Sequence, residues 1–309
     1  MLALVNPHAG GGKGLARWER VRDAVAARVG GVATVLPADA AEAREAIRRA
    51  LWDGERDFIA AGGDGTVNLA VNTLLAHVTV AERQRLRLGA VGLGSSNDFH
   101  KPHRSDGWIG RIPVRLRFDR TAAHDVGRLR YLLPDSEWRC RRFILNASIG
   151  VTAEGNRRFN DDPTVARVKR VHPDLGMTWA ALAALFDGGP WPMRITTNDD
   201  PPVTDRVTNL GVVKNPHFTG MLRYDTSYEP GSGAFDVHLL GNVSRAARVR
   251  AIVGLCCGRF VGRRGTTSWR ARRLGVAADV PFAVEADGEV IVTTAVEFSL
   301  DPRALAVCT

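Results

Sequence analysis

The sequence has little cysteine and no long apolar segment. Its four cysteines, Cys140, Cys256, Cys257 and Cys308, show no C-x-x-C spacing. This favours reduced thiols of a cytoplasmic protein and argues against a disulfide framework or a zinc site. No stretch approaches the roughly 20 apolar residues of a membrane-spanning helix, and "MLALVNP" has no basic leader or cleavage site, so we do not expect secretion. Any contact with lipid is expected to be peripheral, at the inner face of the membrane.

Signatures of several well-known sites are also missing. "NPHAGGGKG" at 6–14 lacks the G-x-x-x-x-G-K-[ST] pattern of a P-loop, and "GGDGTVN" at 62–68 lacks the G-x-G-x-x-G of a dinucleotide-binding fold. The histidines, among them His100, His103 and His172, show no metal-ligand spacing such as H-E-x-x-H. Neither an RNP1 motif nor a zinc finger is present, so we expect no nucleic-acid partner.

The chain is nevertheless long and basic. Its 309 residues and 45% hydrophobic content are enough for two domains of ordinary size. The net charge of +9 and the pI of about 10.1 rest largely on arginine, which favours phosphates, acidic lipid surfaces or nucleic acid as partners. One arginine-rich run could bind anionic headgroups or form a solvated face: Arg259, Arg263, Arg264, Arg270, Arg272 and Arg273.

Strand and helix patterns alternate over the first hundred or so residues. Apolar runs predict strands at 2–6, 32–36 and 57–63, periodic segments predict helices at 15–29, 38–54 and 66–76, and 86–99 repeats the strand and glycine turn. In the first helix we expect Leu15, Trp18, Val21, Val25 and Val29 to form one apolar stripe. This alternation predicts a doubly wound, Rossmann-like three-layer α/β/α domain whose ligands lie beyond the carboxyl ends of parallel strands.

After about residue 120 the pattern changes to successive strands with turn-rich links. It predicts a C-terminal antiparallel β-sandwich domain, so the fold class is α/β plus β. Two helical segments, 163–188 and 244–260, interrupt the strands, and "TTNDDPPVTD" is expected at a hairpin tip.

The turn "GGDGTVN" combines glycines with one acid. Uncovered backbone N–H groups of Gly62, Gly63 and Gly65, at the start of a helix, can bind phosphate, although glycines of this kind also serve in ordinary tight turns. Asp64 would repel a phosphate held against it. We therefore expect Asp64 to act through a magnesium ion or on a hydroxyl group.

Seven motifs in order resemble the diacylglycerol kinase catalytic family of lipid kinases, which includes sphingosine kinases and is distantly related to NAD kinases. They are "NPHAGGGKG", "GGDGTVN", "GLGSSNDF" at 92–99, "HDVG" at 124–127, "FILNASIG" at 143–150, "FTGM" at 218–221 and "EADGEV" at 285–290. The resemblance implies a nucleotide-binding domain at 1–127, a β-rich lipid-substrate domain at 128–292 and a segment, 293–309, that returns to the first domain.

The resemblance also implies the site residues. Asp64, Asp98 and Asp125 would organise a hydrated Mg²⁺, and the general base would come from Asp287 or Glu289, with Asp64 also catalytic. Lys13 and Arg17 are placed to reach phosphate oxygens. The positions matching ATP contacts are Asn6, Pro7, Gly10, Gly62, Gly63, Asp64, Gly65, Thr66, Asn68 and Ser95, with Thr34 on a looser alignment.

One motif departs from the family pattern. Where the family carries an acid that helps bind a second, structural magnesium, this chain has Ser232 in "PGSGAFDV". A hydroxyl is a poor ligand for a hard dication, so that site is expected to be empty or to rely on backbone carbonyls and Asp236.

The sequence thus predicts an ATP- and Mg²⁺-dependent kinase that phosphorylates a hydroxyl of a diacylglycerol-like or sphingoid lipid at a membrane surface. Three alternatives remain: an NAD kinase-like enzyme for a soluble substrate, a non-catalytic lipid or nucleotide sensor, and, most weakly, a nucleic-acid binder. The acceptor lipid is not specified, "TWAALAALF" at 178–186 could line an acyl channel or be core, and a homodimer remains open.

Overall fold

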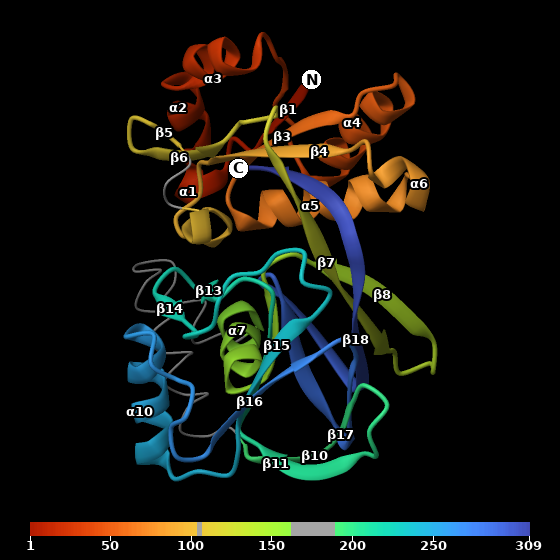
Figure 1. The fold of residues 1–309 in the computed structure, drawn as a ribbon, viewed down its shortest axis with the longest axis vertical. Helices are drawn as coiled ribbons and strands as arrows, with labels where there is room; N and C mark the ends of the chain where they lie inside the picture. The colour runs from red at the N-terminus through yellow and green to blue at the C-terminus, as the bar shows by residue number, and fades with distance from the viewer. Residues whose placement is uncertain (104–106, 162–188) are drawn as a thin grey trace.

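The computed structural model describes residues 1–103, 107–161 and 189–309 (Figure 1). The helix predicted over 163–188 lies outside these residues, as do "TWAALAALF" and His172. Within them, an N-terminal α/β half and a C-terminal β-rich half confirm the predicted fold class.

The first half contains a parallel sheet with strand order β4-β3-β1-β2. Alternate residues of β1 enter different cores: Leu2 and Leu4 pack toward one face, and Ala3 and Val5 toward the other. Because both faces are covered by helices, the strands are continuous apolar runs. The strands are β1 (Leu2–Val5), β2 (Ala33–Val35), β3 (Asp57–Gly62) and β4 (Arg87–Gly92).

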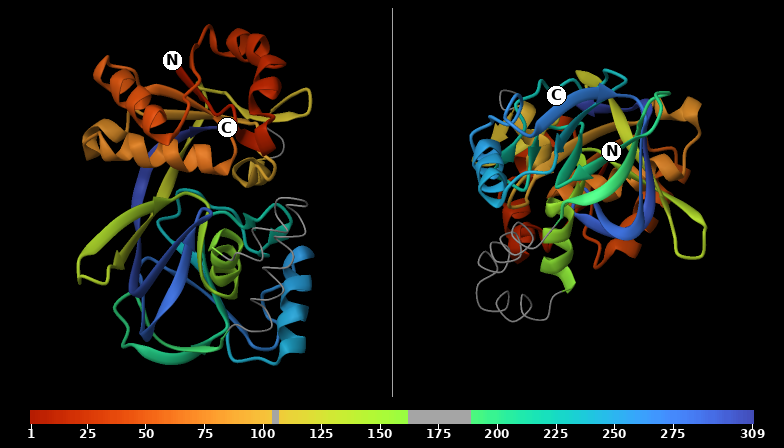
Figure 2. Two further views of the ribbon diagram at one scale, coloured as in Figure 1. Left: turned by 180° about the vertical axis from the view of Figure 1, so that it is seen from behind. Right: turned by 90° about the horizontal axis from the view of Figure 1, so that it is seen from below.

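Helices cover the two faces of this sheet and make three layers. On one face pack α4 (Ala40–Trp52) and α5 (Asp64–Ala76), and on the other α2 (Gly14–Glu19) and α3 (Arg22–Val29). Figures 1 and 2 show the sheet edge-on between them. Short helices α1 (Ala9–Gly12), α6 (Val80–Arg83) and the 3-10 helix η1 (Asp98–His103) complete this half.

The prediction of a single helix over 15–29 was wrong. The chain leaves the helix at Arg20 and Val21, where the Val21 N–H bonds the Trp18 carbonyl at 2.9 Å in a tightened last turn. Trp18, Val21 and Val25 are buried as expected. Leu15, at the start of α2, is 43% exposed and does not belong to the buried stripe.

The C-terminal half is built from antiparallel strands around one core. The strand order is β16-β15-β12-β9-β17-β18, and an irregularity between Ala277 and Phe282 lets β17 pair first with β10 and then with β9. These strands are β8 (Trp138–Phe143), β9 (Asn146–Gly150), β10 (Trp191–Thr197), β11 (Val203–Val207), β12 (Asn209–Val213), β15 (Phe235–Leu240), β16 (Thr266–Ala271) and β17 (Leu274–Ala286). Helices α7 (Val151–Asp161) and α10 (Arg245–Cys256) lie outside the strands.

Two long strands, β7 (Thr121–Leu132) and β18 (Glu289–Cys308), connect the halves. They pair antiparallel along most of their length, and the end of β18 pairs parallel to β4 through Ala306 and Val307. The chain therefore returns to the first sheet after building the second half (Figure 1). The exact domain boundaries stay a prediction.

Two short strand pairs were not predicted. They are β5 (Trp108–Ile109) with β6 (Ile112–Arg115) in the first half, and β13 (His217–Phe218) with β14 (Leu222–Arg223) in the second. Among the described residues, no helix is long and apolar enough to cross a membrane.

Candidate active site

Three predicted loops meet where β1, β3 and β4 end. The Asn6 side-chain amide donates to the Thr66 hydroxyl at 3.1 Å, which joins the first loop to the "GGDGTVN" turn. Gly63 and Gly94 bring the second and third loops into backbone contact, since a Cβ added to Gly94 would lie 2.5 Å from the Gly63 Cα. Parallel strands place these loops at one edge of the sheet, as the sequence predicted.

The first loop is an open glycine turn. Gly10, Gly11 and Gly12 have φ values of +61°, +72° and +82°, which favour glycine over other residues. Gly11, Gly12 and Lys13 are exposed, and the carbonyl of Pro7 accepts the N–H of Leu15 to close the turn. The backbone of this turn is therefore accessible to an anion, with the Gly12 N–H already donating to the His8 carbonyl at 3.0 Å.

Asp64 organises the loop that follows β4. Its two carboxylate oxygens accept the backbone N–H groups of Asp98 and Phe99 at 3.1 and 2.9 Å. Burial raises the pKa of Asp64, with the neighbouring Asp98 charge adding to the effect against the two N–H donors. Asp64 and Asp98 are thus close neighbours, as expected.

Asp98 links this loop to the second half. One carboxylate oxygen pairs with Lys101 and the other accepts the Gly220 N–H at 3.0 Å, while Lys101 also donates to the Gly220 carbonyl. The Asn215 amide donates to the Asp98 carbonyl at 2.9 Å. The "FTGM" turn therefore rests against the "SSNDF" loop.

Asp125 does not join Asp64 and Asp98 through any contact seen in the structure. Its buried carboxylate is occupied by Lys214 and by the N–H groups of Gly233 and Arg303. The described residues contain no group of three His, Cys, Asp or Glu side chains that could hold a metal ion. The gathering of Asp64, Asp98 and Asp125 around one hydrated magnesium ion stays a prediction, and the contacts of Asp125 in the structure are with Lys214, Gly233 and Arg303.

Asp287 is fixed at the turn between β17 and β18, where its φ is +47°. Its carboxylate accepts the Asn68 amide at 2.7 Å and the backbone N–H groups of Ile144, Leu145 and Asn146 at 2.7 to 3.1 Å. Burial raises the pKa of Asp287 to about 6, against the opposing effect of these donors. The late "EADGEV" motif thus contacts the early "GGDGTVN" motif directly.

The two glutamates of "EADGEV" differ in environment. Glu289 is 56% exposed and pairs with Arg141 of β8. Glu285, which the sequence analysis did not single out, is buried, accepts the Ser148 hydroxyl at 2.9 Å and the Gly288 N–H, and has its pKa raised by burial to about 7. Its place near the end of β17, two residues before Asp287, is the signal in the sequence that could have indicated it.

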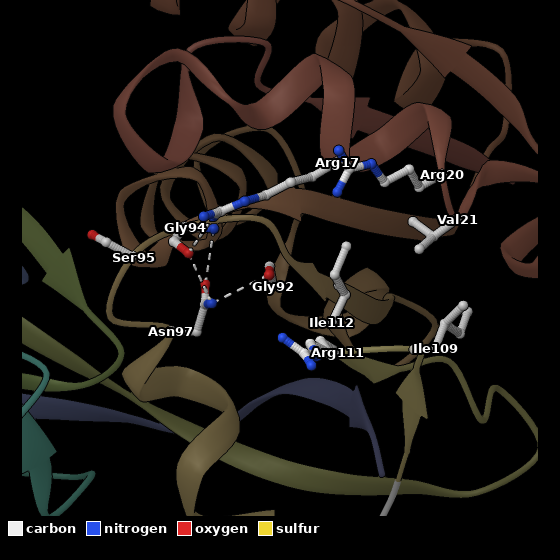
Figure 3. Close-up of a pocket in the computed structure, with 11 residues that line it drawn as sticks. Arg17, Arg20, Val21, Gly92, Gly94, Ser95, Asn97, Ile109, Arg111 and Ile112 are labelled. Carbon is white, nitrogen blue, oxygen red and sulfur yellow. Dashed lines mark hydrogen bonds between the residues drawn. The ribbon is translucent and has the colours of Figure 1, made fainter.

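A pocket of about 510 Å³ opens beside the third loop. Figure 3 shows Arg17 reaching the loop, where it donates to the carbonyls of Leu93 and Gly94 at 2.6 and 2.9 Å, with Arg111 on another wall. Ser95 lines the pocket, as does Arg20. The sequence suggested Arg17 as a phosphate contact but missed Arg20, at the end of α2, and Arg111, because the β5–β6 wall that carries Arg111 was not predicted.

Three weaker candidates lie apart from these loops. Thr34 is on edge strand β2 opposite Ala3, in the middle of β1, so the structure does not bring it to the strand ends. Asp236 lies on β15 and faces Arg270 at 3.7 Å. The exposed Ser232 hydroxyl bonds the Ala234 carbonyl at 3.1 Å.

Comparisons with known proteins agree with this arrangement. Residues 1–125 match the diacylglycerol kinase catalytic domain, and residues 146–309 match the YegS C-terminal NAD kinase beta sandwich-like domain. Comparison with curated proteins finds no match.

Solved structures show the same fold. Two solved structures from Bacillus anthracis str. Sterne, one described as "a putative diacylglycerol kinase" and one as a diacylglycerol kinase, align with TM-scores of 0.72 and 0.66, at 16% and 14% identity. Both alignments cover 99% of this chain, and 96% and 95% of the respective relatives. The matched domains and their order along the sequence show that the chain belongs to the diacylglycerol kinase catalytic domain family, with a YegS-type C-terminal domain.

Proposed function

We propose that the protein is an ATP- and Mg²⁺-dependent lipid kinase that transfers the γ-phosphoryl group of ATP to a hydroxyl of a diacylglycerol-like or sphingoid lipid. The observation that carries the proposal is the hydrogen bond between Asn68 and Asp287, which joins the glycine turn of one half to the acidic turn of the other. Phosphoryl transfer needs chiefly alignment, charge neutralisation and a proton acceptor.

The first half contains the features that suit nucleotide binding. The exposed glycine turn at 10–12 and the N-terminus of α5 present backbone N–H groups, and Arg17, Arg20 and Arg111 add positive charge around one pocket. At about 510 Å³ the pocket is of the size usual for small-molecule ligands. ATP fits these features by both charge and size.

The donor set near the loops also fits a metal. The carboxylates of Asp64 and Asp98 would hold Mg²⁺, which would neutralise phosphate charge when bound. Asp64 is held by hydrogen bonds to η1, and Asp98 is held by Lys101 and Gly220. The loops that carry the two carboxylates are therefore preorganised for ligand binding.

We assign the proton acceptor to Glu289. Asp287 accepts four N–H groups, so its role is to position the turn that carries Glu289. Glu289 is exposed, and its contact in the described structure is an ion pair with Arg141, which a bound substrate hydroxyl can replace. Asp64 would orient the η1 loop and the metal rather than take the proton.

The lipid side of the proposal is supported by the surface of α10. Val249 and Val253 lie exposed on one helix face, the latter 55% exposed, with Arg250 between them. Met221, in the turn between β13 and β14, is a further exposed apolar side chain of this half. An apolar stripe flanked by arginine is suited to an anionic membrane surface.

The proposal is tested by supplying ATP, Mg²⁺ and mixed micelles that contain diacylglycerol, monoacylglycerol, sphingosine or ceramide. A phosphorylated lipid is the expected product, identified by mass spectrometry. Phosphorylation of NAD instead would favour the soluble-substrate alternative. A folded protein that binds ATP and modifies none of these acceptors would favour a sensor.

A further inference from the structure

A buried lysine lies where the two halves meet. Lys214 follows β12, and its side chain is 3% exposed. Its ammonium group donates to the carboxylate of Asp125 at 3.0 Å and to the carbonyls of Ala234 and Glu229 at 2.8 and 3.4 Å. We call these three oxygens and the surrounding loop 229–234 the junction cage.

The three oxygens of the junction cage match the three N–H donors of an ammonium group. An ammonium has three N–H groups and no acceptor, and Lys214 has three oxygen partners. The Asp125 carboxylate also accepts the backbone N–H groups of Gly233 and Arg303, at 2.7 and 2.9 Å. The buried positive charge and the fully buried carboxylate therefore compensate each other.

The cage is assembled from segments far apart in the sequence. Asp125 belongs to β7, which comes from the first half, and Arg303 to the irregular part of β18. The backbone N–H of Asp125 donates to the Pro230 carbonyl at 2.8 Å, which holds the loop 229–234 against β7. The charge of Lys214 thus stabilises the contact between the crossing strands and the second half.

The same loop is where the family resemblance implied a structural magnesium. The donors present do not fit that ion: Mg²⁺ prefers six oxygens at about 2.0–2.1 Å, whereas the Ser232 hydroxyl is exposed and bonded to Ala234. The remaining acid, Asp236, faces Arg270 on β16. A dication would also be repelled by the Lys214 ammonium group.

Lysine, rather than arginine, occupies the centre of the cage. The chain has 38 arginines and four lysines, Lys13, Lys101, Lys169 and Lys214. A guanidinium is planar and broad, while an ammonium is compact and can face three converging oxygens. A lysine at this position in such an arginine-rich chain agrees with the geometry of the cage.

We propose that Lys214 is the resident cation of the junction cage, a covalently tethered replacement for the structural metal that the family resemblance implied. The second half then needs no divalent ion to fold or to hold the crossing strands. Any metal requirement of the protein is confined to the loops around Asp64 and Asp98. This inference is independent of the proposed reaction.

Thermal unfolding of the full chain without nucleotide tests the proposal. In an Asp64→Asn background, which removes a carboxylate of the proposed active-site metal, the melting temperature should be the same in EDTA and in millimolar MgCl₂ or CaCl₂. Lys214→Met should lower the wild-type melting temperature by roughly 10 °C, because the Asp125 carboxylate stays buried and loses its positive partner. Lys13→Met, which removes an exposed lysine, is the matched control and should leave it unchanged.

A second variant tests the exchange of cations directly. Lys214→Met combined with Ser232→Asp gives the cage a carboxylate in place of the ammonium, so CaCl₂ or MgCl₂ should raise its melting temperature relative to EDTA. If this variant does not fold, metal analysis of purified Asp64→Asn provides the test, and it should find no stoichiometric divalent ion. One equivalent of metal retained by Asp64→Asn, or a lower melting temperature of Asp64→Asn in EDTA, would overturn the proposal.

Discussion

The side-chain amide of Asn68 lies 2.7 Å from the carboxylate of Asp287, 219 positions later in the chain. Asn68 ends the "GGDGTVN" motif on α5, and Asp287 opens the turn that carries Glu289. The same carboxylate also binds three consecutive backbone N–H groups between β8 and β9. One acid therefore fixes the acidic turn relative to the glycine loops.

This contact predicts energetic coupling between the two residues. Asn68→Ala and Asp287→Ala should each destabilise the protein, and the double variant should be more stable than additivity predicts by about 1–2 kcal/mol, since the hydrogen bond involves a carboxylate. Urea unfolding of the four proteins of the cycle measures this. Additive effects would mean that the two motifs do not contact each other in solution.

The buried Glu285 predicts a dependence of stability on pH. Burial raises the pKa of this carboxyl from 4.5 to about 7 in the folded protein. Between these values the unfolded chain has lost the proton that the folded chain retains, so Glu285 contributes a fall of about 3 kcal/mol in the free energy of unfolding as pH rises from about 4.5 to about 7.

Glu285→Gln should remove most of that decline. Denaturant unfolding at several pH values from about 5 to 8 provides the measurement, and Glu297→Gln, an exposed residue of β18, is the control that should keep the wild-type slope. An equal slope in Glu285→Gln and wild type would assign the effect to another group.

Arg111 is predicted to contribute to nucleotide affinity. It lines the same pocket as Ser95 and Gly94, from another wall (Figure 3), and loss of one charged hydrogen-bond donor should weaken ATP binding roughly ten-fold. Titration calorimetry of Arg111→Ala tests this. Arg117→Ala removes an exposed arginine outside the pocket and controls for net charge; if both variants lose affinity equally, the pocket is not the nucleotide site.

The exposed face of α10 is predicted to bind anionic membranes. Val253→Asp should reduce cosedimentation with phosphatidylglycerol vesicles, because it places a negative charge within the apolar stripe beside Arg250. Val80→Asp introduces the same change at an exposed valine of α6 in the first half. Similar losses in the two variants would point to an effect of net charge rather than to this surface.

Much of the fold and of the site could be predicted from the sequence. Continuous apolar runs marked β1, β3 and β4, and the glycine turns after them marked the loops that meet at one edge of the sheet. This worked because parallel strands gather their carboxyl ends whatever the intervening sequence.

Other features depend on contacts between distant segments, which a single sequence does not contain. Asp125 was grouped with Asp64 because its motif matched, yet its partner is Lys214. Nothing local to Lys214 indicates burial, since it directly follows a strand and precedes Asn215 in an ordinary turn. The break between α2 and α3 was missed for a related reason: the apolar spacing of Trp18, Val21 and Val25 continues across it.

The central claim is that the glycine loops and the acidic turn form one site for phosphoryl transfer to a lipid. The most direct measurement compares wild type with Glu289→Gln, following ATP binding by calorimetry and transfer of labelled γ-phosphate to lipid in micelles. We expect unchanged ATP affinity and a loss of turnover of about 10²-fold or more. Undiminished lipid phosphorylation by Glu289→Gln would contradict the account.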